Sequence, residues 1–95
     1  MVQQEFARGY IDYLEYVDGH LIVAGWMFVN SRPFEVLHMK INNNVIAYAT
    51  PAHREDVQAA FPSVPNAIKS GFSFYTPVKK ELFDDWVTLE IVGVS

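Results

Sequence analysis

Turn-forming residues interrupt this chain at intervals of about eight to twelve residues. The strongest break is Asp18-Gly19, because both residues tolerate positive φ and an apolar run lies on either side. Further breaks at Asn30 to Pro33 and at Asn42 to Asn44 separate more runs of alternating apolar residues. Spacing of this kind is typical of an all-β sandwich or barrel.

The alternation between these breaks predicts six strands. They span residues 9–17, 20–29, 34–41, 45–49, 72–78 and 86–94. The second strand is apolar on both of its faces, with Leu21 and Val23 on one side and Ile22 and Trp26 on the other. Such a strand is expected at the centre of a sheet, with both faces covered.

Between the fourth and fifth strands the pattern changes to one that is typical of a short helix. Thr50 is a suitable N-cap, Pro51 suits the first helical position, and two acidic residues follow in the early turns. The predicted helix begins at Pro51 or Arg54 and ends at Ala60, before a proline.

Six strands and one short helix must form two layers of sheet, because the helix is too small to cover either apolar face. The predicted fold is all-β: a two-layer, immunoglobulin-like antiparallel β-sandwich of about six to seven strands with one short crossover helix. A small closed barrel is the alternative. A chain of 95 residues has room for one core, so residues 1–95 are expected to be a single domain, either whole or excised from a larger multidomain protein.

Charge and composition exclude several partners. The net charge is −4, and the basic residues are scattered apart from Lys79-Lys80, so a nucleic-acid partner is not expected. The longest uncharged apolar run, Leu21 to Val29, is far shorter than the roughly 20 residues of a membrane-spanning helix. The chain has no cysteine, which excludes disulfides and fits a reducing compartment, so a cytoplasmic location is expected.

Residues with catalytic or metal-binding chemistry are not grouped in the sequence. The spacing of His20, His38 and His53 is unlike that of metal ligands, and no cysteine assists them. No serine lies in a hydrolase-type Gly-x-Ser-x-Gly context, and the five glycines are too dispersed for a phosphate-binding loop. We therefore expect no metal, no cofactor and no catalysis.

The tyrosines are the most suggestive side chains for binding. Tyr10 and Tyr16 have the same parity as Asp12, so one face of the first strand is expected to carry two rings that flank a carboxylate. Tyrosine rings with a polar tip suit a carbohydrate platform. The alternative is that these tyrosines only pack at the sheet margin, since tyrosine favours strands.

Several short motifs occur in a recognisable order. They are Ile11-Asp12, Gly25-Trp26, Arg54-Glu55-Asp56-Val57 and Gly71-Phe72. Over about Gly9 to Phe74 this order resembles a small β-sandwich accessory module that is appended to bacterial glycosyltransferases and other cell-envelope polysaccharide-biosynthesis proteins.

The resemblance implies a non-catalytic accessory domain whose partner is a glycan or the catalytic domain of a parent protein. With the tyrosine pattern, it makes Tyr10, Asp12, Tyr16, Arg54 and Asp56 the candidate ligand-binding residues. An ion pair that braces the loop at the helix is a second interpretation of Arg54 and Asp56. The alternative function is a structural or protein-interaction spacer, with weak self-association through an unpaired strand edge.

Overall fold

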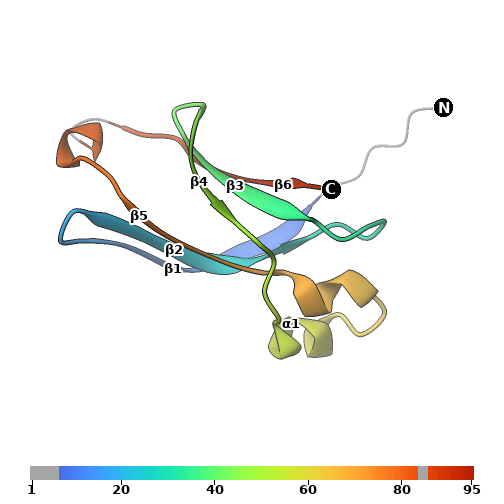
Figure 1. Ribbon diagram of the computed structural model, residues 1–95. Helices are drawn as coiled ribbons and strands as arrows, with labels where there is room; N and C mark the ends of the chain where they lie inside the picture. The colour runs from blue at the N-terminus through green and yellow to red at the C-terminus, as the bar shows by residue number, and fades with distance from the viewer. Residues whose placement is uncertain (1–6, 84–85) are drawn as a thin grey trace.

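Two three-stranded antiparallel sheets lie face to face in the computed structural model, which describes residues 7–83 and 86–95 (Figure 1). The first sheet has the order β1 (Arg8–Val17), β2 (His20–Phe28), β5 (Gly71–Pro77), and the second has the order β4 (Asn44–Ala49), β3 (Val36–Ile41), β6 (Leu89–Val94). The helical segments are α1 (Glu55–Ala60), η1 (Pro65–Lys69) and η2 (Lys80–Phe83). The predicted all-β sandwich is therefore confirmed.

The central strands β2 and β3 supply most of the core between the sheets. Leu21 and Val23 of β2 face Leu37, Met39 and Ile41 of β3, and all five are buried. β5 adds two phenylalanines from its inner face, Phe72 and Phe74. The predicted alternation is confirmed in β3 and over most of β2 and β5, where the inward positions are buried and the positions between them are less so.

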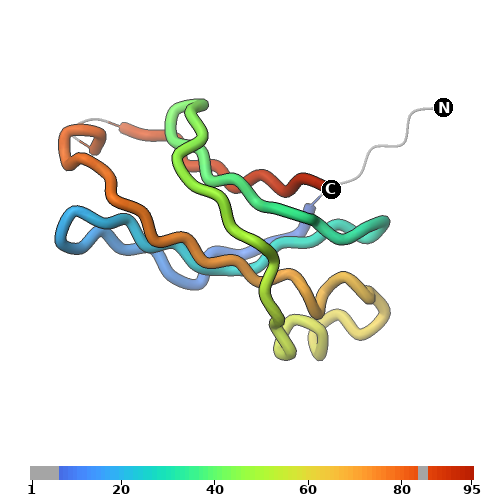
Figure 2. Tube along the Cα trace, in the orientation of Figure 1, coloured from blue at the N-terminus to red at the C-terminus, as the bar shows by residue number. Residues whose placement is uncertain are grey.

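A second, smaller apolar cluster lies on the outer face of β2. Phe28 packs there with Val57 of α1 and Ala67 of η1, and Trp26 and Phe61 border them. Figure 2 shows the chain leaving β4, passing through α1 and η1 at one end of the sandwich, and returning as β5. The helical segments thus cover only the end of β2, so the prediction that both of its faces are covered holds only at that end.

Backbone conformation at the turns agrees with the sequence prediction. Asp18 and Gly19 have φ values of 51° and 77°, and Asn42 and Asn43 have 50° and 70°. Both turns therefore use residue types that tolerate the left-handed region, where most other side chains are strained. These turns join β1 to β2 and β3 to β4.

Several predicted boundaries differ from the structure; the third strand, for example, begins at Val36 and not at residue 34. Of the two predicted helix starts, Pro51 with Thr50 as its N-cap is wrong, because Ala52 pairs with Gly71 through two backbone hydrogen bonds of 2.8 Å and is held extended. The other predicted start, Arg54, agrees with the structure to within one residue, since Arg54 is the N-cap of α1. The last strand begins at Leu89, because the backbone N–H and C=O of Thr88 are both bonded to Asn42 in the β3–β4 turn.

Among the described residues, no helix has the length and hydropathy needed to cross a bilayer.

Candidate functional site

A β-bulge at Asp12 determines how the residues of β1 are oriented. Ile11 lies opposite Gly25 and Tyr13 lies opposite Ala24, so Asp12 is an extra residue without a partner in the ladder. A bulge of this kind shifts the alternation of side chains by one position. Residues on the two sides of Asp12 therefore follow opposite parities.

The bulge places Tyr10 and Tyr16 on opposite faces of the sheet. Tyr10 lies opposite Trp26, whose side chain is on the outer face, whereas Tyr16 lies opposite the core residue Leu21. The prediction that both rings flank Asp12 on one face is thus wrong. Tyr16 has a packing role instead, because its hydroxyl donates to the Val78 carbonyl at 2.6 Å and its ring centroid lies 4.9 Å from that of Phe83.

Arg54 joins the bulge of β1 to α1. It occupies the N-cap position of α1, and its Nη1 donates to Asp12 Oδ2 at 2.6 Å. Its Nε and Nη2 donate to the two carboxylate oxygens of Asp56 at 2.9 and 2.8 Å. Nη1 also donates to the Gly25 carbonyl of β2 at 3.3 Å. We call the three charged residues Asp12, Arg54 and Asp56 the arginine clasp.

The arginine clasp leaves little hydrogen-bonding capacity for a ligand. The guanidinium has five N–H groups in general, and Arg54 makes four hydrogen bonds within the chain. The side chain of Arg54 is also only 26% exposed. The structure thus brings together three of the five candidate residues, in the arrangement expected of a brace.

Gly25 permits the close approach of β1 at the bulge. A Cβ atom at this position would overlap the Tyr10 carbonyl oxygen and would lie 2.9 Å from the Phe72 ring. Only glycine leaves this space free, so Gly25 is as much a part of the site as the charged residues. The same residue supplies the carbonyl that Arg54 binds.

The clasp also changes the protonation behaviour of its members. Hydrogen bonds from Arg54 lower the pKa of Asp56 from its ordinary value of 3.8 to about 2. Hydrogen bonds to Asp56 and Asp12 in turn raise the pKa of Arg54 above its ordinary value. Asp56 thus stays ionised at neutral pH, which does not suit it to act as a proton donor.

The lowered pKa of Asp56 predicts a loss of stability in acid. A carboxyl group whose pKa is lower in the folded state stabilises the fold above its unfolded pKa, and this contribution disappears as the pH falls through the folded pKa. We expect the difference in unfolding free energy between wild type and Asp56→Asn to be constant above about pH 5 and to shrink toward pH 2. Urea unfolding across this range measures it. A difference that is the same at both ends would contradict the ion pair.

Three exposed tyrosines share the outer face of the β1–β2–β5 sheet. Tyr10, Tyr13 and Tyr75 are 65%, 46% and 67% exposed. Tyr13 and Tyr75 lie on the two outer strands, and the small residues Ala24 and Ser73 pair in the row that starts at Tyr13. We call these five residues the tyrosine face. The Tyr75 ring is held by stacking on His20, with centroids 4.6 Å apart and planes 11° apart.

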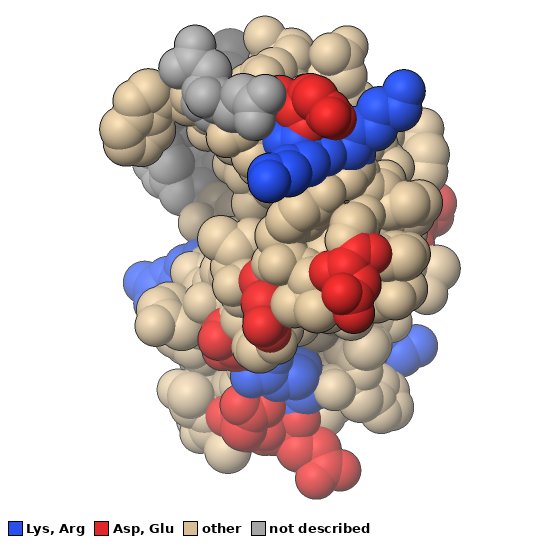
Figure 3. Space-filling model, turned by 90° about the vertical axis from the view of Figure 1, so that its left-hand side faces the viewer, with Lys and Arg blue, Asp and Glu red and all other residues tan. Residues whose placement is uncertain are grey.

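Of this face, only Tyr10 is one of the five candidate ligand-binding residues predicted from the sequence. The position of Tyr75 on the outer face can be predicted from the sequence, because Tyr75 alternates with Phe72 and Phe74, which are buried. The position of Tyr13 on this face cannot be predicted from simple alternation, since the bulge moves its side chain to the same face as Tyr10. On the side of the molecule shown in Figure 3, acidic and basic residues form small groups, some of mixed sign and some of one sign, with uncharged surface between them.

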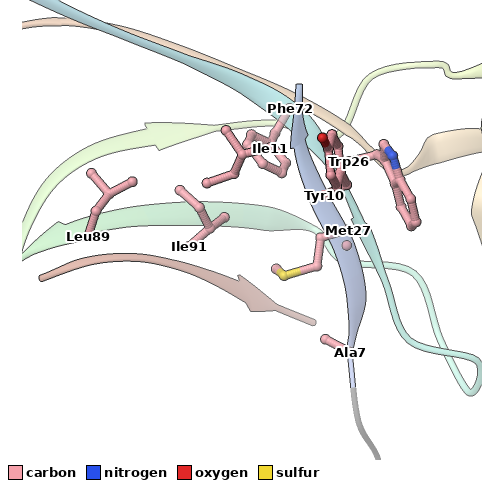
Figure 4. Close-up of a pocket in the computed structure, with 9 residues that line it drawn as sticks. Ala7, Tyr10, Ile11, Trp26, Met27, Phe72, Leu89 and Ile91 are labelled. Carbon is pink, nitrogen blue, oxygen red and sulfur yellow. The ribbon is translucent and has the colours of Figure 1, made fainter. Parts of the chain in front are cut away.

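An open apolar cavity of about 310 Å³ lies between β1, β2 and β6. Figure 4 shows Ile11 and Met27 on one side of it and Leu89 and Ile91 on the other. None of the described residues that line it is acidic, basic or a histidine.

Within residues 7–83 and 86–95, no group of three or more histidine, aspartate or glutamate side chains could hold a metal ion.

No protein-family model, curated protein or solved structure matches the chain significantly.

Proposed function

We propose that this chain is a non-catalytic accessory domain that binds carbohydrate through the tyrosine face and acts beside a bacterial glycosyltransferase. The observation that carries the proposal is the exposure of three tyrosines on one face of a single sheet. Aromatic rings offer apolar surface for the C–H groups of a sugar ring, and their hydroxyls offer hydrogen bonds. The clasp contributes by fixing the bulge that turns Tyr13 toward this face.

The dimensions of the sheet favour a sugar chain over a single sugar. Tyr13 and Tyr75 lie on strands separated by β2, and two strand intervals amount to about 10 Å. The small Ala24 and Ser73 leave the surface low between them. The carboxylate of Glu15 offers a polar group at the margin of this face, because Glu15 and Tyr75 both lie beside Ile22 on the two neighbouring strands. The net charge of −4 favours a neutral glycan over an acidic one.

The motifs that resemble the glycosyltransferase-associated module have a structural role in this chain. Gly25 makes room for the bulge, Arg54 and Asp56 form the clasp, and Gly71 pairs with Ala52. These motifs describe how the fold is braced and leave the tyrosine face outside the pattern. This supports a shared scaffold whose members differ in what they bind.

The proposal predicts localised binding of neutral oligosaccharides. We expect cello-, chito-, manno- or maltohexaose to shift the amide resonances of Tyr13 and Tyr75 in an NMR titration. Tyr13→Ala and Tyr75→Ala should each weaken binding at least about fivefold, because each removes one stacking surface. Tyr48→Ala is the matched control, since Tyr48 is also 67% exposed but lies in the other sheet.

Two results would contradict carbohydrate binding at this face. One is the absence of resonance shifts with every glycan tested, including oligosaccharides from bacterial envelopes. The other is an equal loss of affinity in Tyr48→Ala.

The alternative function, a protein-interaction module, has a different supporting observation in the exposed edge of β1.

A further inference from the structure

The strand β1 is the most exposed element of the sandwich. All ten of its residues are exposed, and among the described strands it pairs only with β2, at one of its two edges. Half of the large hydrophobic residues that are exposed in the described chain belong to this one strand. They are Tyr10, Ile11, Tyr13, Leu14, Tyr16 and Val17. Such a concentration of apolar surface on an edge strand is typical of a strand that pairs with another chain.

Apart from the bulge at Asp12, β1 lacks the features that usually keep an edge strand from pairing. It contains neither lysine nor proline, and it is ten residues long, whereas the other edge strands have six or seven. Asp12 at its bulge is paired with Arg54, a cation that it shares with Asp56. The remaining charged residues, Arg8 and Glu15, lie near the two ends of the strand and have opposite signs.

We propose that β1 pairs with β1 of a second copy of this chain, antiparallel about a twofold axis between Ile11 and Asp12. In this register Arg8 lies opposite Glu15 of the second copy, and Tyr10 lies opposite Tyr13 of the second copy. Both pairs occur twice because of the symmetry. Because Arg8 and Glu15 of one copy lie opposite Glu15 and Arg8 of the other, the charges of β1 are complementary to those of a second β1, which favours a second copy of this chain as the partner at this edge.

The bulge makes this register possible. A twofold axis between two residues places each odd-numbered residue opposite an even-numbered one, and in a regular strand these would lie on opposite faces. In β1 the residues before the bulge have Arg8 and Tyr10 on the outer face, opposite Phe28 and Trp26. After the bulge, the outer face carries odd-numbered residues.

These odd-numbered outer residues are Tyr13 and Glu15, which lie opposite Ala24 and Ile22. Each therefore meets Tyr10 or Arg8 of the second copy on the same face of the joined sheet. The two three-stranded sheets would become one sheet of six strands, with the two tyrosine faces side by side. A single strand pair is a small interface, so the association is weak and depends on concentration.

Charge exchange tests both the dimer and its register. Sedimentation velocity of the wild-type chain should show a monomer–dimer equilibrium at concentrations up to about 1 mM. Glu15→Arg and Arg8→Glu should each weaken the dimer by about tenfold, because each creates like charges at both contacts. The double variant Arg8→Glu/Glu15→Arg should restore the wild-type dissociation constant.

An equimolar mixture of the two single variants provides a further test of the register. In the mixed dimer, Arg8 of the Glu15→Arg variant lies opposite Glu15 of the Arg8→Glu variant. The two introduced side chains lie opposite each other at the second contact and also have opposite signs. The mixture should therefore dimerise with about the wild-type dissociation constant, although each variant alone does so only weakly.

Lys40→Glu is the control, because Lys40 lies on β3 in the other sheet and should leave the equilibrium unchanged. Arg8 also lies over the Phe61 ring, with its Cζ 5.6 Å from the centroid. If Arg8→Glu fails to fold, the effect of Glu15→Arg on the monomer–dimer equilibrium still tests the proposed register. A wild-type chain that stays monomeric at about 1 mM, or a dimer that is indifferent to Glu15→Arg, would overturn the proposal.

Discussion

Replacing Gly25 with alanine is expected to lower the free energy of unfolding by about 2–3 kcal/mol. The added methyl group would overlap the Tyr10 carbonyl oxygen, which belongs to backbone and has little freedom to move. It would also press on the Phe72 ring, which is part of the core. For a domain of this size we expect the melting temperature to fall by more than about 10 °C.

The matched control for Gly25→Ala is Ser73→Ala, a substitution of an exposed residue on the neighbouring strand of the same sheet. Its effect should stay within about 0.5 kcal/mol. Urea unfolding followed by tryptophan fluorescence measures both variants. If Gly25→Ala unfolds at the same urea concentration as wild type, β1 does not cross Gly25 as closely as described.

The second large effect is expected from Arg54→Ala, which removes the centre of the clasp. The substitution leaves the half-buried Gly25 carbonyl without its side-chain partner and frees two carboxylates that share one cation. Because the ion pairs are partly open to solvent, they contribute modestly, and we expect a total loss of about 1–2 kcal/mol. The same measurement of urea unfolding applies.

Arg54→Lys separates charge from geometry. Lysine keeps the positive charge but cannot bind both oxygens of Asp56 in the forked arrangement, so it should recover only part of the stability. Lys79→Ala, which removes an exposed cation elsewhere, should have little effect. Equal stability of Arg54→Ala and Lys79→Ala would show that the clasp does not brace the fold.

The fold followed from local patterns wherever one face of a strand is buried. The alternation of Leu37, Met39 and Ile41 is sufficient to predict β3, and Asp18-Gly19 is sufficient to predict the first turn. Of the two predicted starts of α1, Arg54 agrees with the structure and Pro51 is wrong, because Ala52 is held extended by Gly71. That pairing joins residues far apart in the sequence, and local propensity carries no signal for it.

The arginine clasp was predictable in its members but not in its arrangement, and the tyrosine face was predictable only in part. Arg54 and Asp56 are two residues apart, and an ion pair between them was one interpretation of the sequence. Asp12 is 42 residues from Arg54, so their contact depends on the tertiary fold. The bulge at Asp12 arises from this same fold, and for that reason parity assigned Tyr16 to the wrong face.

The cluster of Phe28, Val57 and Ala67 is separate from the core between the sheets, and it has consequences for dynamics. A segment whose side chains pack in a small cluster of their own can open independently of the rest of a domain. Backbone amides of α1 and η1 should therefore exchange with solvent through subglobal opening, while amides of β2 and β3 exchange only on global unfolding. In this protein the helical end would then be a cooperative unit distinct from the paired sheets.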